Sequence, residues 1–275
     1  MTERAYQFGA RLNLLGILNE PPDGARTGTP IVLLLNAGLL HRVGPHRLSV
    51  ELARRLARQG IASLRLDVGG RGDSEASSAD GTAEANVIAD IRAAMDFLEQ
   101  QTGCGQFVLL GLCAGADGAH AAALEDPRVA GVVLLDGYGY RTLGYYLRHY
   151  APRALRPRAW LNYLRRLVRR PRGEALEMGA HGQRQPFGAR LAVAHEMQTL
   201  VDRGVELLYV YTGGAADYYN YAGQFVRMFH SLAGHGRIAV EFYPTADHTY
   251  TFSEDRERLL ARVLDWCGTR RWQAS

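Results

Sequence analysis

Six predominantly apolar runs alternate with helical patterns along the chain, and this alternation restricts the fold more than any other feature of the sequence. A short continuous apolar run is typical of a strand that is buried on both faces of a sheet. When helices separate such strands, they form a parallel sheet with right-handed crossovers, helices on both faces and sites at the carboxyl ends of the strands. The runs are residues 30–36, 61–67, 107–112, 129–136, 205–211 and 238–243.

The segments between these runs complete an α/β domain. Residues 4–18 alternate weakly and lead into a Pro-Pro-Asp-Gly turn, which predicts an antiparallel hairpin or edge ribbon. With 275 residues, 47% of them hydrophobic, the chain is long enough for a single domain (1–275) that carries an insertion. Helical periodicity predicts helices over residues 45–59, 82–101, 114–125, 191–203, 220–232 and 253–267.

The alternation pauses between residues 141 and 190, and we interpret this segment as a helical cap insertion. Residues 141–172 hold ten arginines and no acidic residue, although the whole chain has a net charge of only +4. A basic amphipathic helix is predicted near residues 157–170. Arginine pairs with phosphate and carboxylate groups, so the cap is expected to bind a phosphate-bearing or acidic partner such as coenzyme A or an acyl carrier protein.

Two other interpretations of the arginines stay open. All 32 basic residues of the chain are arginine, so the cap could be a solvated surface whose charge reflects genome composition. A basic amphipathic helix could also lie on a membrane surface. No recognised nucleic-acid-binding motif accompanies the charge, so we expect no nucleic acid partner.

The cysteines indicate the compartment. Cys104, Cys113 and Cys267 are odd in number and irregularly spaced, which predicts neither a disulfide framework nor a zinc site. We therefore expect no metal and no cofactor. The sequence has no apolar stretch of about 18 residues, so we expect a cytoplasmic protein without a transmembrane segment. Whether it is a monomer or a homodimer is left open.

The run at residues 107–112 leads directly into the tripeptide Cys-Ala-Gly. Gly111 and Gly115 flank Cys113 as G-x-C-x-G, which is the nucleophile-elbow pattern with sulfur in place of the serine oxygen. The glycines are needed because the apex residue adopts a strained backbone that brings strand and helix close together. Cys113 would then lie at a helix N-terminus, which favours the thiolate. The alternative is an ordinary buried cysteine.

A nucleophilic thiol needs a base and an acid that orients the base. His248 follows the last predicted strand, and Asp217 follows the strand before it. The order Cys113, Asp217, His248 is the nucleophile, acid, histidine order of the α/β-hydrolase fold. We therefore predict these three as the catalytic residues. Asp136, just after the strand that follows the elbow, is the rival acid, and Asp247 is a weaker one.

An oxyanion needs backbone N–H donors. The residue after the nucleophile, Ala114, is expected to supply one of them, and the loop after Asn36 the other. We choose Leu39 for the second donor, with Gly38 as its alternative. Asn36 to Gly38 could instead be an ordinary tight turn.

Aromatic residues gather around the predicted cap. Eleven of the fourteen tyrosines lie between positions 138 and 221. They would line a substrate pocket if they face inward, and otherwise they are scattered core and surface residues. The candidate substrate or cap contacts are Tyr138, Tyr145, Tyr218 and Arg148.

The sequence resembles the α/β-hydrolase superfamily over nearly its whole length. Three segments, Asn36 to Arg47, Asp67 to Ser74 and Gly111 to Ala116, resemble the bacterial hydrolases associated with exosortase A and exopolysaccharide clusters. The resemblance implies the α/β-hydrolase fold and a Cys-His-Asp acyl hydrolase or thioesterase, like the dienelactone hydrolases, which also use cysteine. Ala37-Gly38 replaces the usual His-Gly of the oxyanion loop, which puts the donor geometry in doubt.

These features predict an enzyme that acts through an acyl-Cys113 intermediate. A thiol nucleophile forms a thioester, which favours thioester substrates, and either hydrolysis or acyl transfer would follow. An ester or lactone hydrolase of the dienelactone type is one alternative. A catalytically silent scaffold that binds a ligand or a carrier protein through the cap is the other.

Overall fold

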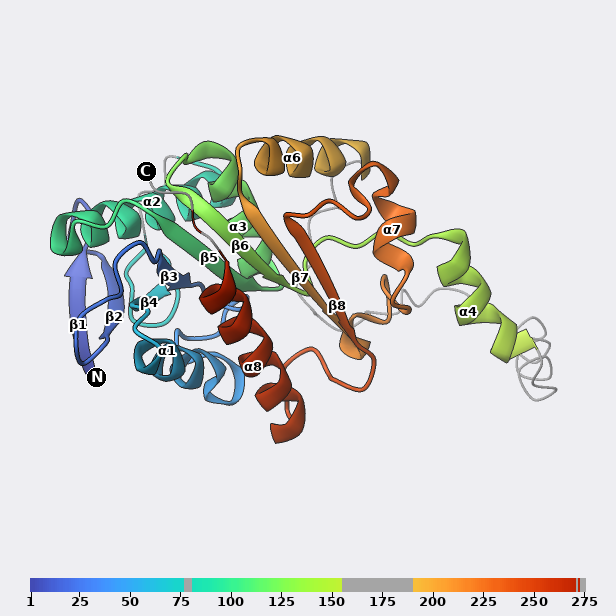
Figure 1. Cartoon of the computed structure of the whole chain (residues 1–275), viewed down its shortest axis with the longest axis horizontal. Helices are drawn as coiled ribbons and strands as arrows, with labels where there is room; N and C mark the ends of the chain where they lie inside the picture. The colour runs from blue at the N-terminus through green and yellow to red at the C-terminus, as the bar shows by residue number, and fades with distance from the viewer. Residues whose placement is uncertain (77–80, 155–189, 271, 273–275) are drawn as a thin grey trace, which may run out of the picture.

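A computed structural model describes residues 1–76, 81–154, 190–270 and 272 (Figure 1). The described residues form one eight-stranded sheet in the order β1-β2-β4-β3-β5-β6-β7-β8. Strands β3 to β8 run parallel to one another, and β2 pairs antiparallel with both β1 and β4. The strands are β1 (Thr2–Phe8), β2 (Leu14–Glu20), β3 (Ile31–Leu34), β4 (Ser63–Asp67), β5 (Phe107–Leu112), β6 (Val129–Leu135), β7 (Glu206–Thr212) and β8 (Ile238–Tyr243).

The six apolar runs are confirmed as the parallel strands, and most of them are buried along their whole length. Every residue of β3, β4, β5 and β7 is buried, as expected for strands covered on both faces. The parallel register brings the carboxyl ends of these strands to one edge of the sheet. The predicted catalytic residues Cys113, Asp217 and His248 all lie in segments that follow strands at this edge.

The N-terminal hairpin is confirmed, but it turns earlier than the Pro-Pro-Asp-Gly segment. The turn lies between Gly9 and Asn13, where the N–H of Leu12 donates to the Gly9 carbonyl at 3.0 Å. Gly9 has a φ of 86° and Leu12 a φ of 54°. A glycine in the left-handed region lets the chain reverse at low steric cost.

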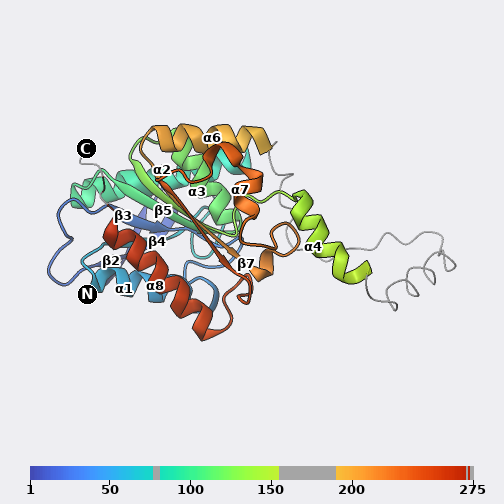
Figure 2. The same cartoon turned by 45° about the vertical axis from the view of Figure 1, so that its right-hand side comes forward.

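Helices cover both faces of the sheet (Figure 1 and Figure 2). On one face, α1 (Leu48–Arg58) and α8 (Ser253–Thr269) pack against the sheet and against each other. The other face is covered by α2 (Ala83–Thr102), α3 (Ala114–Glu125) and α6 (Arg190–Asp202). This three-layer arrangement buries one hydrophobic core on each side of the sheet.

The helix expected at residues 220–232 is broken. The structure has a short α7 (Gln224–Met228), a break at Phe229 with φ −126° and ψ 62°, and a 3-10 turn η3 (His230–Leu232). The Gln224 side chain accepts a hydrogen bond from the N–H of Asn220 and donates to the carbonyls of Tyr140 and Tyr218. These bonds start the helix at Gln224 and tie it to the chain after β6.

Part of the predicted cap is described. Helix α4 (Leu143–Ala154) begins two residues after the cap boundary and projects away from the end of the sheet that carries β7 and β8 (Figure 1 and Figure 2). The basic helix expected at residues 157–170 lies outside the described residues. Among the described helices, none has the length and hydropathy needed to cross a membrane.

Candidate active site

Cys113 occupies the apex of a sharp turn between β5 and α3. Its backbone has φ 57° and ψ −121°, a conformation that is sparsely populated for a residue with a side chain. The N–H of Cys113 donates to the Leu135 carbonyl at 3.0 Å, and its carbonyl accepts from the N–H of Ala116 at 2.9 Å. These bonds hold the strained residue between the end of β6 and the first turn of α3.

The two flanking glycines are required by close backbone contacts. A Cβ atom at Gly111 would lie under 3.0 Å from the backbone of Gly115 and Ala116. A Cβ at Gly115 would lie under 3.0 Å from the carbonyl oxygen of Asn36. The elbow helix therefore packs directly against the loop that follows β3, and any side chain at these positions would separate them.

His248 contacts both Asp136 and Cys113. Its Nδ1 lies 2.7 Å from Oδ2 of Asp136, and its ring also hydrogen-bonds with the Cys113 thiol. Asp136 is fully buried and accepts two further hydrogen bonds from Thr212, from the N–H at 2.7 Å and from the hydroxyl at 2.6 Å. The Tyr218 hydroxyl donates to the Asp136 carbonyl at 2.9 Å. Asp136 is thus held by three residues, His248, Thr212 and Tyr218.

The neighbours of His248 stabilise its protonated form. The hydrogen bond to Asp136, followed by that to Cys113, raises the pKa of His248 to about 9, while burial opposes the shift. At neutral pH the ring therefore carries a proton beside the Cys113 sulfur. A cationic imidazole in contact with a thiol favours the thiolate.

The predicted acid, Asp217, does not reach His248, and Asp136 takes that position. After β7 the chain turns through η2 (Gly213–Ala215), and the Asp217 carbonyl accepts hydrogen bonds from Arg141 and Tyr145. A Cβ at Gly214 would lie under 3.0 Å from the backbone of His248, so the histidine loop packs directly on this tight turn. His248 consequently lies above the end of β7 and faces the residue that directly follows β6.

The remaining rival acid, Asp247, has a local role. Its carboxylate accepts hydrogen bonds from the N–H groups of Thr249 and Thr251. It therefore shapes the loop that carries His248. Neither Thr212 nor the hydroxyl of Tyr218 was predicted as a partner of Asp136. The signal for Thr212 was its position at the end of the strand next to the one that Asp136 follows.

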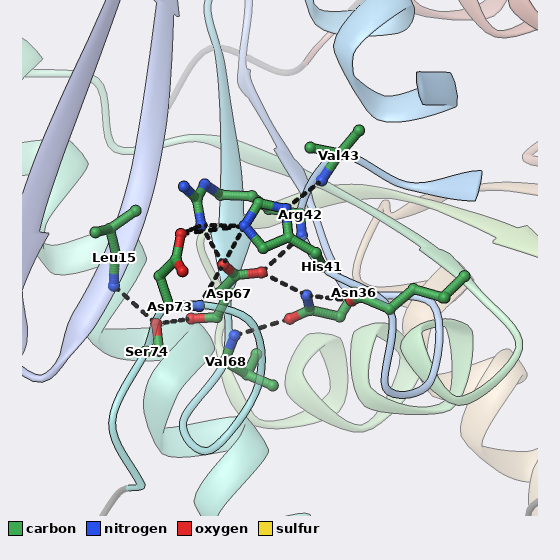
Figure 3. Close-up of polar contacts among 10 residues, drawn as sticks. Leu15, Asn36, His41, Arg42, Val43, Asp67, Val68, Asp73 and Ser74 are labelled. Carbon is green, nitrogen blue, oxygen red and sulfur yellow. Dashed lines mark hydrogen bonds and ion pairs between the residues drawn. The ribbon is translucent and has the colours of Figure 1, made fainter. Parts of the chain in front are cut away.

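The loop after β3 is held by a buried network that sequence analysis missed (Figure 3). The Asn36 side chain donates to Oδ1 of Asp67 at 2.7 Å and to the Leu40 carbonyl at 2.8 Å, and it accepts from the N–H of Val68. Asp67 is fully buried at the end of β4. The signal in the sequence was a polar residue directly at the end of each strand. The network joins the two loops and fixes the backbone from Asn36 to Leu40, where Gly38 and Leu39 lie.

Arg42 neutralises the buried Asp67 (Figure 3). Its guanidinium contacts Oδ2 of Asp67 and lies 2.7 Å from Oδ2 of Asp73, while its N–H donates to Oδ1 of Asp67 at 2.7 Å. The Asp73 N–H also donates to Asp67 at 3.1 Å. A Cβ at Gly72 would lie under 3.0 Å from this carboxylate, so the loop after β4 closes tightly around it.

Within the described chain, one group of side chains has metal-ligand spacing: His41, Asp67 and Asp73. The Arg42 guanidinium contacts both of these carboxylates and lies 2.8 Å from Nε2 of His41. A positive charge that belongs to the protein already occupies the centre of the group. We therefore interpret the group as an ion-pair network.

The predicted substrate or cap contacts have different surroundings. Tyr145 is 2% exposed and its hydroxyl donates to the Asp217 carbonyl, so it is a packing residue. Tyr218 supports Asp136, and Tyr138 packs edge-on against the ring of His120. The exposed Arg148 lies over the ring of Tyr221 at 4.2 Å.

Comparisons with known proteins identify the fold. The family model described as "Serine aminopeptidase, S33" matches residues 38–156. A comparison with curated proteins gives no match. The chain is similar to the solved structure of the carboxylesterase CesB from Bacillus subtilis, with 18% identity, a TM-score of 0.60, and coverage of 98% of this chain and 93% of that chain.

Two further structures are similar over nearly their whole length. A dienelactone hydrolase from Anabaena variabilis has 15% identity and a TM-score of 0.58, with 96% of each chain covered. An α/β serine hydrolase without lid from Xanthomonas campestris has 14% identity and a TM-score of 0.56, with 100% of this chain and 96% of that chain covered. The protein has the α/β-hydrolase fold. The resemblance to exosortase-associated hydrolases stays a prediction.

The elbow predicts the effect of adding a methyl group at Gly111. We expect Gly111→Ala to lower the free energy of unfolding by more than about 3 kcal/mol, because the added Cβ overlaps fixed backbone. Gly24→Ala is the control: Gly24 has a φ of 83° and no atom within 4 Å of the added Cβ, so only the backbone cost of about 1 kcal/mol applies. Urea unfolding measures both, and equal losses would contradict the close contact.

The Asp67 network predicts a large cost for removing Arg42. We expect Arg42→Met to lower the free energy of unfolding by about 3 kcal/mol, because it leaves a buried carboxylate without its cation. Arg4→Met is the matched control, since Arg4 and Glu20 form an exposed pair at 3.9 Å that contributes about 0.5 kcal/mol or less. Similar losses in the two variants would show that Arg42 does not neutralise Asp67.

The raised pKa of His248 predicts a pH dependence of stability. A histidine whose pKa is higher in the folded than in the unfolded protein stabilises the fold below its unfolded value, near 6.5, and this contribution is lost as the pH rises through about 9. We expect the stability difference between wild type and His248→Gln to decrease over that range. A difference that stays constant or grows would contradict the raised pKa.

Proposed function

We propose that the protein is a cysteine-dependent acyl hydrolase in which Cys113 attacks the acyl carbon of a thioester or ester. The observation that carries this proposal is the contact of His248 with both the Cys113 thiol and the buried Asp136. Nucleophile, orienting acid and base then follow the chain order Cys113, Asp136, His248, which is the order of this fold. The strained backbone of Cys113 supports the same role, because such strain concentrates at functional residues.

The first half of the reaction forms the acyl-enzyme. The Cys113 thiolate bonds to the acyl carbon, and the carbonyl oxygen becomes an oxyanion held by the N–H groups of Ala114 and Leu39, or Gly38. The oxyanion then collapses and the bond to the leaving group breaks. Protonated His248 gives its proton to the departing thiol or alcohol, while Asp136 stays ionised and holds the ring.

The second half releases the acid. Neutral His248 takes a proton from water, the hydroxide adds to the acyl carbon, and the bond to Cys113 breaks. The products are a carboxylic acid, the Cys113 thiolate and protonated His248, so the resting state is restored. An amine or thiol acceptor in place of water would make the same step an acyl transfer.

The thiol nucleophile favours thioester substrates. Acyl-Cys113 is itself a thioester, so exchange with a thioester substrate is nearly balanced in energy, whereas attack on an oxygen ester goes uphill. The arginines of residues 141–172 support a carrier with phosphate or acidic groups, such as coenzyme A or an acyl carrier protein. Ester or lactone hydrolysis is the second candidate, favoured by the structural likeness to the dienelactone hydrolase and to the carboxylesterase.

Trapping the intermediate tests the proposal. The protein is mixed with a panel of acyl-coenzyme A and acyl-N-acetylcysteamine thioesters and with p-nitrophenyl esters, and intact mass is recorded within seconds. We expect one acyl group on Cys113, and no adduct and no turnover with Cys113→Ala. Equal turnover by Cys113→Ala would contradict the role of the thiol. No adduct and no turnover with any donor would contradict the proposal and support a silent scaffold.

The acid is tested by a pair of aspartate variants. We expect Asp136→Asn to lower kcat by about 10³-fold or more, because His248 loses the carboxylate that orients its ring. Asp217→Asn is the matched control. Its kcat should stay within about threefold of wild type, because Arg141 and Tyr145 donate to the backbone carbonyl of Asp217, which the substitution retains. Steady-state kinetics on the best substrate decide between them, and the reverse ranking would restore Asp217 as the acid.

A further inference from the structure

An apolar pocket lies between α1, α8 and the sheet, on the face of the sheet opposite α3. Of its twelve described lining residues, eleven are apolar and Ser49 is the only polar one. They come from the loop between β3 and α1, from β5 and β6, and from the two helices. Such a lining offers water few hydrogen-bond partners, so the pocket suits an apolar group.

The wall that the sheet contributes to this pocket lies next to the proposed nucleophile. Leu112 directly precedes Cys113, and Leu135 accepts a hydrogen bond from the Cys113 N–H through its carbonyl at 3.0 Å. Cys113 itself packs against the hydrophobic cluster to which both leucines belong. An acyl group bonded to the Cys113 sulfur is therefore attached beside the pocket.

The mouth of the pocket lies in the loop that is proposed to bind the oxyanion. Three lining residues are partly exposed, Ala37, Pro45 and Ser49, and the other nine are buried. Ala37 directly precedes Gly38 and Leu39, one of which is proposed to donate its N–H to the oxyanion. The pocket therefore opens where the carbonyl carbon of a bound substrate would lie.

The loop at the mouth is also tied to the loop that carries the base. Nε2 of His46 lies 3.3 Å from Oγ1 of Thr251, three residues after His248. The chain here passes through the left-handed region at Gly44 (φ 73°), His46 (φ 48°) and Arg47 (φ 64°). Side-chain-bearing residues keep such conformations only where the surrounding structure holds them, and these positions concentrate at ligand sites. The pocket thus adjoins all three parts of the proposed site.

We propose that this pocket binds the acyl chain of the substrate and selects a short linear chain. The inference rests on the proposed function, because the chain enters as part of the acyl group that Cys113 accepts. The empty space is about 400 Å³ with the open mouth included, and its enclosed part is narrow. Buried leucines of α8, Leu259 and Leu260, close it. A linear chain fits such a pocket up to a limited length.

Acylation by a series of thioesters tests the proposal. The donors are N-acetylcysteamine thioesters with acetyl, butyryl, hexanoyl, octanoyl and decanoyl chains, so the leaving thiol stays the same. Intact mass gives the second-order rate constant for acylation of Cys113. We expect it to rise about fourfold per added methylene, because each methylene leaves water for apolar surroundings. The rise should end at hexanoyl or octanoyl, and decanoyl should react more slowly.

Two variants change the pocket in opposite directions. Leu52→Ala enlarges it and should move the preferred chain to the next longer member of the series, whereas Ser49→Leu narrows the mouth and should move it to the next shorter one. Leu56→Ala is the matched control. Leu56 lies one turn further along α1, is equally buried and does not line the pocket, so this variant should keep the wild-type preference at a similar loss of stability. Urea unfolding confirms that the variants fold.

The chain-length profile separates this proposal from the proposed function. Acylation without a preferred length, or a preference that Leu52→Ala and Ser49→Leu leave unchanged, would overturn the pocket while Cys113 remains the nucleophile. No acylation by any donor would overturn the proposed function. Calorimetric binding of the same thioesters to Cys113→Ala then tests the pocket alone. Affinity that rises with chain length, with an optimum that Leu52→Ala lengthens, would support it, and affinity independent of chain length would overturn it.

Discussion

The close contact between the backbones of β5 and α3 is the constraint on which the site depends. Gly111 and Gly115 have no side chains, so the strand and the helix meet at a distance that would exclude any other residue. The chain between them can then turn only through a strained conformation at Cys113. The same contact places the first turn of α3 against Asn36, and this brings the thiol, a helix N-terminus and the loop after β3 together.

Two buried carboxylates fix the loops around this elbow. Asp136 at the end of β6 receives hydrogen bonds from Thr212 and His248, and Asp67 at the end of β4 receives them from Asn36 and Arg42. A buried charge is costly unless hydrogen bonds and an opposite charge satisfy it. Each carboxylate therefore holds the groups around it in one arrangement. Asp136 orients His248, the proposed base, and Asp67 holds the loop after β3, which is proposed to bind the oxyanion.

Much of the fold could be predicted because its signals are local. Buried strands form apolar runs, and an elbow needs glycines around its apex, so the strands and Cys113 were visible in the sequence. The choice between Asp136 and Asp217 was not, since both follow strands at the correct edge. It depends on how tightly the chain turns at Gly213–Ala215, and on the contact of Gly214 with the His248 loop. The burial of Tyr145 was not visible in the sequence for a similar reason, because it follows from how α4 docks.

The central claim is that His248 and Asp136 activate Cys113 as a nucleophile, and alkylation of the three cysteines tests it most directly. The three cysteines, all among the described residues, form no disulfide; Cys104 is partly exposed, like Cys113, and Cys267 is buried. With iodoacetamide at neutral pH and peptide mass analysis, Cys113 should react faster than Cys104 and Cys267, and Asp136→Asn should slow Cys113 alone. Reaction of Cys113 no faster than Cys104, with no effect of Asp136→Asn, would contradict the account.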